Sequence, residues 1–284
     1  DDSVVFKVFD DLLERFNFTV SEDTPFDVDV AVDPEMLGKV YESLIHEEER
    51  GEAGIFYTPR VEVDFICRQS ILEYLMENTD VSHEKLISFI YSTEEDRADL
   101  LSKEEAKAIG NALYRAKIVD PACGSGAFLV GMLHVLMELY IQILKRLDVK
   151  LNLFEVKKEI INNNLYGADI KDWAVRVAEL RLWLTLLVET EESEIKLDAK
   201  KPLLPNLTFK LRCGDSLVQE IGGKPLGARA MMTHLDPICR SYIKELYEEK
   251  RKYYYSRTDD PDVLARIKKK EVEIVKMLVD SEIK

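Results

Sequence analysis

The first thirty residues are acidic and weakly patterned, but from Met36 to about Tyr114 apolar residues recur every three or four positions, the spacing of an amphipathic helix. One helix is predicted to begin after the Asp33 cap and Pro34, and a second where Thr58 caps the chain and Pro59 opens the first turn. A third begins at the capping box of residues 102–105. Residues 1–110 are therefore expected to form a helical region.

The pattern changes at Lys117, where short apolar runs begin to alternate with helical periods. Strands are predicted at 118–119, 165–169 and 207–213, and helices at 127–147, 154–162 and 174–188. This alternation is typical of a parallel, right-handed α/β sheet, here a partial Rossmann-like core over residues 111–222. Residues 223–284 form a third domain, in which long charged helices at 241–257 and 263–283 make a hairpin. A narrow apolar seam is predicted to hold it, formed by Leu264, Ile267, Val275 and Leu278.

Each predicted strand ends in an acidic residue: Asp120, Asp169 and Asp215. Ligands of an open parallel sheet bind outside the carboxyl ends of its strands, so these carboxylates are expected to meet at one edge. Gly124 and Gly126 follow the first strand and let the backbone approach a ligand closely.

S-adenosylmethionine carries hydrogen-bond donors that suit these acids. Asp120 would accept from the α-amino group, Asp169 from the ribose hydroxyls and Asp215 from the adenine amine. A dinucleotide cofactor is the rival ligand, but its third glycine position is Leu129 here, and Asp169 follows Asp120 by 169 − 120 = 49 positions instead of about 20.

Four motifs resemble those of amino-group DNA methyltransferases, particularly N6-adenine enzymes of the type IIG restriction–modification and phage-defence kind. They are Asp-Pro-Ala-Cys-Gly-Ser-Gly-Ala-Phe-Leu at 120–129, Gly-Ile-Phe-Tyr-Thr-Pro at 54–59, Tyr-Gly-Ala-Asp-Ile at 166–170 and Cys-Gly-Asp-Ser-Leu at 213–217. The resemblance covers roughly residues 36–218. It implies S-adenosylmethionine as cofactor, double-stranded DNA as partner of the intact enzyme, and these cofactor-binding residues: Tyr57, Thr58, Pro59, Asp120, Ala122, Gly124, Gly126, Asp169, Ile170 and Asp215.

The chain departs from this family in one respect. The catalytic Asn/Asp-Pro-Pro-Tyr/Phe motif, which binds the flipped base, has no counterpart, because the sequence contains no Pro-Pro pair. We therefore expect the cofactor-binding half of an adenine-N6 methyltransferase, inactive by itself. An N4-cytosine methyltransferase and a non-catalytic cofactor-binding or assembly module remain the alternatives.

The net charge bears on which partners the chain can bind. At a formal −15 it disfavours nucleic-acid binding except through a local basic patch, such as the tract at 250–257.

Four isolated cysteines and four histidines lack metal-ligand spacing, so no metal site is predicted and a reducing cytoplasm is expected. The apolar stretch at 128–147 is interrupted by charged residues, which argues against a membrane span. Cys123, in the glycine turn, is expected to be a packed thiol, and His134, in the apolar stretch, a buried histidine of the core.

Overall fold

The structure, a computed structural model, describes residues 58–92, 97–187, 207, 209–217, 220–221, 224–225, 237–254 and 261–283. These residues fall into two compact units, which are treated separately. One holds a parallel sheet with the helices packed on it, and the other holds a pair of long helices. Tyr57 and the helix expected after Pro34 lie outside the described residues. The division into three domains at residues 110 and 222 stays a prediction.

The sheet has three parallel strands, β1 (Ile118–Asp120), β2 (Leu165–Asp169) and β3 (Leu211–Cys213), in the order β1-β2-β3. This arrangement confirms the predicted partial Rossmann-like fold. β3 is shorter than the predicted strand 207–213, because Phe209 and Lys210 form a turn before it. Phe209 packs instead against Tyr253 in the core of the second unit, and this contact explains why the apolar run does not continue as strand.

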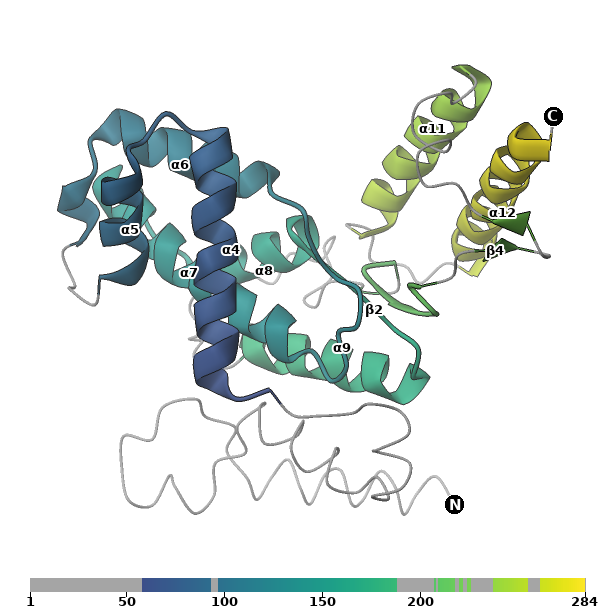
Figure 1. Cartoon of the computed structure of the whole chain (residues 1–284), viewed down its shortest axis with the longest axis horizontal. Helices are drawn as coiled ribbons and strands as arrows, with labels where there is room; N and C mark the ends of the chain where they lie inside the picture. Colours follow the sequence, from purple (N-terminus) through teal and green to yellow (C-terminus); the bar gives the residue numbers. More distant parts are fainter. Residues whose placement is uncertain are drawn as a thin grey trace, which may run out of the picture. The chain divides into compact units, whose positions relative to one another are not determined.

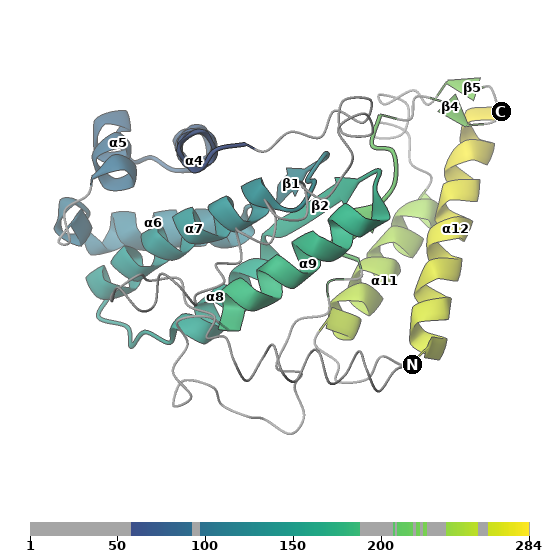
Figure 2. The same ribbon diagram turned by 90° about the horizontal axis from the view of Figure 1, so that it is seen from below.

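Among the described residues, three helices lie between the strands of the sheet along the chain. α7 (Ala127–Arg146) and α8 (Leu153–Asn163) lie between β1 and β2, and α9 (Asp172–Leu187) follows β2. α7 and α9 run side by side, and both contact β2 (Figure 2). All three helices begin and end within two residues of the predicted bounds.

The helix α7 is the central helix of this unit. Its length and composition would also suit a membrane span, and among the described residues it is the one helix of that kind. More than half of it is buried in the protein, and its Glu138 pairs with Arg68 and Arg97. These contacts are typical of a core helix. His134 is exposed on the outer face of α7, so the prediction of a buried histidine was wrong: a helix of this length has one polar face even when most positions are apolar.

Within residues 58–117, which the structure describes apart from 93–96, four helical segments precede the sheet: α4 (Arg60–Asn78), α5 (His83–Tyr91), the 3₁₀ helix η1 (Arg97–Leu100) and α6 (Lys103–Arg115). α4 packs on α7 and stands out as the long dark-blue helix in Figure 1. Gly131 of α7 permits this approach, because an added Cβ would lie 2.3 Å from Cγ1 of Val63.

The starts of two of these helices were predicted. The capping box of α6 is confirmed: the Glu105 amide donates to Ser102 Oγ at 3.1 Å, and the Ser102 amide donates to Glu105 Oε2 at 2.8 Å. Thr58, in contrast, does not cap α4. Pro59 occupies the N-cap position in an extended conformation, so the helix begins one residue later than predicted.

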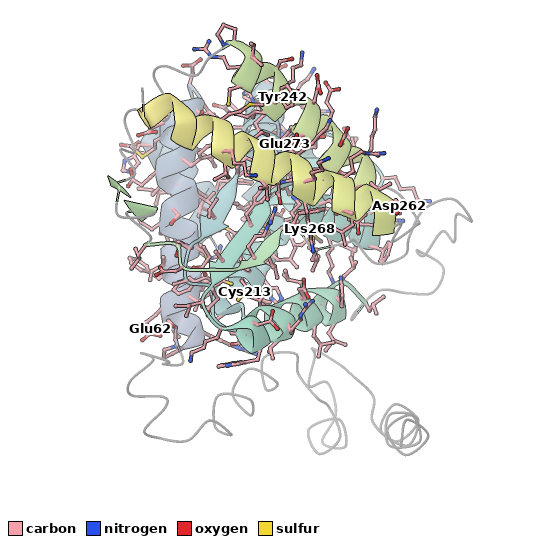
Figure 3. The ribbon with its side chains drawn as sticks, turned by 90° about the vertical axis from the view of Figure 1, so that its right-hand side faces the viewer. Glu62, Cys213, Tyr242, Asp262, Lys268 and Glu273 are labelled. Atoms are coloured by element: carbon pink, nitrogen blue, oxygen red, sulfur yellow. The ribbon has the colours of Figure 1, made fainter. Side chains whose placement is uncertain are left out.

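The second unit contains α11 (Pro237–Tyr254), α12 (Pro261–Ile283) and a short antiparallel pair, β4 (Glu220–Ile221) and β5 (Lys224–Pro225). α11 and α12 pack together as the predicted hairpin, and Figure 3 labels Asp262, Lys268 and Glu273 along α12. Ile267 is fully buried as expected. The predicted seam was wrong at Val275, which is 47% exposed, because the neighbouring Ile274 takes the buried position.

Candidate functional site

A glycine turn joins the end of β1 to the start of α7. The Cys123 amide donates to the carbonyl of Ala168 at 2.9 Å and so ties the turn to β2. Gly124 and Gly126 both adopt the left-handed conformation, with φ of +51° and +87°. A Cβ on Gly126 would lie 2.9 Å from Cβ of Ala178 in α9, whereas a Cβ on Gly124 would meet no atom of the described residues within 4 Å. Gly126 is therefore packed against a helix, and Gly124 faces a space that the described part of the chain leaves open.

Asp169 lies beside this turn, as the sequence predicts for neighbouring parallel strands. Its Oδ2 accepts the amide of Gly124 at 2.9 Å, and its Oδ1 accepts the amide of Lys171 at 2.9 Å. The carboxylate therefore holds the turn in place and also directs the chain into α9. Each oxygen keeps a second lone pair with which it can accept from a ligand.

Asp120 ends β1 on the same edge of the sheet, where its register partner is Gly167 of β2. Its Oδ1 accepts the amide of Ala122 at 3.1 Å. Its Oδ2 is buried and has no hydrogen-bond partner among the described residues. Burial raises the pKa of Asp120; the Ala122 amide opposes this shift, and repulsion from Asp169 adds to it. A buried acceptor without a donor costs free energy, so this atom is suited to a ligand that brings a cationic donor.

A cavity of about 400 Å³ borders Asp120 and the outer edge of β1. Apolar side chains from α4 and α7 form most of its lining, among them Ile66, Ile71, Phe128 and Met132. The described part of the edge thus combines two carboxylates, an open glycine turn and an apolar hollow.

The other predicted site residues are less closely connected to this edge. Ile170 follows Asp169 directly and is 63% exposed. Thr58 is half-buried and Pro59 is exposed, immediately before α4. Asp215 belongs to the second unit, where its Oδ1 accepts the amide of Leu217 at 2.8 Å. Their roles in binding stay predictions, as does that of Tyr57.

Cys123 lies at the base of the turn. Its side chain is buried, and desolvation raises the pKa of its thiol to about 12, with repulsion from Asp120 and Asp169 adding to the shift. A thiol of this kind is not a nucleophile at neutral pH, so the prediction of a packed cysteine is confirmed.

Arg181 in α9 is a residue of this site that the motif comparison missed. It is 2% exposed, and its guanidinium donates to the carbonyl of Ser125, the central residue of the glycine turn, at 2.9 Å. One signal was available in the sequence: an arginine within the apolar helix that follows the second acid.

The chain is similar to known DNA methyltransferases. Residues 95–220 match the family model described as the DNA-methyltransferase domain of MmeI. A putative type II restriction enzyme and methyltransferase of Methanocaldococcus jannaschii is 35% identical over 216 residues, covering 72% of this chain and 18% of that protein. DNA methyltransferase A of Bacillus subtilis is 28% identical over 188 residues, covering 66% of this chain and 20% of the relative.

Among solved structures, the type IIL restriction–modification enzyme MmeI in complex with DNA aligns with a TM-score of 0.39 and 21% identity. That alignment covers 55% of this chain and 19% of the MmeI chain. The chain therefore spans about a fifth of the length of the curated relatives that it matches. The family match includes the glycine turn and all three strands of the sheet. Together with the sequence matches it confirms the resemblance predicted from the motifs: this chain is a relative of the DNA methyltransferases of type II restriction–modification systems.

Proposed function

We propose that the sheet unit binds S-adenosylmethionine and serves an adenine-N6 DNA methyltransferase of a restriction–modification or phage-defence system. The observation that carries this proposal is the buried Oδ2 of Asp120 beside the glycine turn, which no donor of the described residues reaches. A ligand with a cationic amine satisfies that atom.

The residues at the edge of the sheet fit the chemical groups of this cofactor. Asp120 would accept from the α-amino group, and Asp169 would accept from the ribose hydroxyls with its remaining lone pairs. Gly124 leaves room for the nucleoside to approach the backbone. The exposed side chain of Ile170 offers an apolar surface to the adenine ring. For Asp215, the role of acceptor for the adenine amine is taken from the resemblance alone.

The segment of Tyr57, Thr58 and Pro59 is assigned to the methionine end of the cofactor, as the resemblance implies. When bound, the cofactor supplies an electrophilic methyl group. The residues of this chain bind and orient the cofactor, which places its methyl group for transfer and so contributes to catalysis by proximity.

Double-stranded DNA is the proposed partner of the full protein, and the N4 amine of cytosine is the alternative methyl acceptor. The hairpin contributes less positive charge than its sequence suggests. Lys250 pairs with Glu271, and Lys270 pairs with Glu249 at 2.8 Å, so neither cation is available to phosphate without losing its partner. With the net charge of −15, we assign this chain to cofactor binding and leave base recognition to other residues of the full protein.

Isothermal titration of the chain with S-adenosylhomocysteine and with NAD tests the proposal. S-adenosylhomocysteine keeps the α-amino, ribose and adenine groups, so we expect it to bind and NAD to give no heat. Asp120→Asn keeps the shape and the Ala122 contact but removes the charge, and should weaken binding about tenfold. Asp148→Asn, at an exposed acid away from the sheet edge, is the control and should bind as wild type does. Heat with NAD alone would overturn the proposal.

A further inference from the structure

Arg181 lies beneath the glycine turn, although no cofactor group is assigned to it. One nitrogen, Nη1, donates to the Ser125 carbonyl at 2.9 Å and lies 3.2 Å from Ser125 Oγ. Both residues are buried, Arg181 at 2% and Ser125 at 5% exposure. The bond therefore joins α9 to the middle of the turn in a region that water does not reach.

The two glycines that flank Ser125 show which side of the turn this bond supports. Gly124 has no neighbour within 4 Å of an added Cβ in the described part of the chain, whereas Gly126 is in contact with Ala178, three residues before Arg181 on the same face of α9. Ala178 and Arg181 thus fix the underside of the turn from one helix. The opposite side, where the Gly124 amide meets Asp169, is left for a ligand.

A buried arginine is not explained by packing alone. Removing a cation from water costs several kcal/mol, and an apolar side chain of similar volume avoids that cost. The cost is offset only where the guanidinium makes charge-assisted hydrogen bonds, and the bond to the Ser125 carbonyl is of that kind. A carbonyl held in this way fixes the orientation of the peptide group on either side of it.

We propose that Arg181 is a positioning residue for the cofactor site. Its guanidinium fixes the Ser125 carbonyl by a hydrogen bond. The fixed carbonyl keeps the Gly124 amide in its hydrogen bond to Asp169, and the turn keeps the shape that the nucleoside requires. This inference rests on the proposed function and adds to it a residue outside the family motifs quoted above.

The test compares Arg181→Met with Lys157→Met in the 284-residue chain. Lys157 is a matched control. Like Arg181 it is buried, at 7% exposure, and its amine donates to a backbone carbonyl of α9, that of Thr185, at 3.2 Å and away from the turn. We expect Arg181→Met to raise the Kd for S-adenosylhomocysteine about tenfold and to speed amide exchange at Gly124 and Gly126. Lys157→Met should lower the melting temperature and leave the Kd within about twofold of wild type.

The outcomes separate the two proposals. If Arg181→Met changes neither the Kd nor the exchange of the turn, or changes them no more than Lys157→Met does, the positioning role is wrong. If the wild-type chain does not bind S-adenosylhomocysteine, the cofactor proposal fails, and amide exchange alone then decides the role of Arg181. If Arg181→Met does not fold, Arg181→Lys is measured in its place. That variant keeps the charge and most of the aliphatic stem but loses the planar donor geometry, so its Kd for S-adenosylhomocysteine should rise about threefold. The same comparison with Lys157→Met then decides the outcome.

Discussion

The two units of the protein use their basic side chains in different ways. In the sheet unit, three buried basic side chains donate to backbone carbonyls: Arg181 to Ser125, Lys157 to Thr185, and Arg97, which also pairs with Glu138, to Ser92 at 2.7 Å. In the hairpin, basic residues pair with glutamates of the facing helix, as Lys270 does with Glu249 and Arg266 with Glu249 at 3.8 Å.

From this difference we infer that the sheet unit needs its basic side chains to hold a fixed shape, whereas the hairpin depends on them less. A buried bond to a carbonyl fixes one peptide group and leaves an unsatisfied charge when it is broken. A surface ion pair is screened by salt and gains little free energy, so either partner can be exchanged. We therefore expect substitutions in the sheet unit to have large effects and equivalent substitutions in the hairpin to have small ones.

The largest effect is expected at the packed glycine of the turn. Gly126→Ala places a methyl group 2.9 Å from Cβ of Ala178 and 3.2 Å from its Cα, at a φ of +87° that side chains disfavour. Backbone strain and overpacking together should lower the free energy of unfolding by about 3 kcal/mol in urea denaturation. Gly124→Ala introduces backbone strain without overpacking, because no described residue lies within 4 Å of the added methyl group. It should lower the free energy of unfolding by about 1 kcal/mol. Equal losses for the two variants would contradict the packing argument.

A second effect should depend on pH. Lys210 is 2% exposed, and burial lowers the pKa of its amine to about 7, with repulsion from Lys117 acting in the same direction. In the unfolded chain the amine keeps this proton up to a pH near 10.5, the ordinary pKa of a lysine, so the free energy of unfolding should increase as pH rises above 7.

Measured against Lys210→Met, the wild type should gain about 2 kcal/mol between pH 7 and pH 9. Urea denaturation at both pH values checks this difference. Lys150→Met, at an exposed lysine, should keep the wild-type pH dependence. A pH dependence that survives in Lys210→Met would show that another group is responsible.

The smallest effect is expected in the hairpin. Lys270→Ala removes an amine that bonds to Glu249 at 2.8 Å and to Glu245 at 3.5 Å on the surface of α11. The free energy of unfolding should change by no more than about 0.5 kcal/mol, and the change should vanish in 0.5 M salt. A loss comparable to that of Gly126→Ala would remove the contrast between the two units.

The sequence predicted the elements whose signals are local. The capping box at Ser102 and the alternation of strands and helices around Asp120 and Asp169 depend on residues close together in the chain, and the structure confirms them. The glycine turn was also predictable, because left-handed backbone and close packing both require glycine.

What the sequence did not predict depends on partners far along the chain. The third strand was placed too early because Phe209 packs with Tyr253, 44 positions later (253 − 209). His134 was expected in the core because periodicity cannot show which side of an apolar helix remains uncovered. Arg181 was missed because its partner is a carbonyl 56 positions earlier, and backbone acceptors leave no trace in the residue types.

Gly131 also fixes how α4 is aligned along α7. It is the one glycine within α7, and Val63 fits against it where any larger residue would collide. Sliding α4 by a single turn, about 5.4 Å, would bring Val63 onto a bulkier side chain. The residues just ahead of α4, Thr58 and Pro59, are therefore held at a set distance from the point where α7 begins. The close fit of Val63 against Gly131 limits how far these two residues can shift along α7.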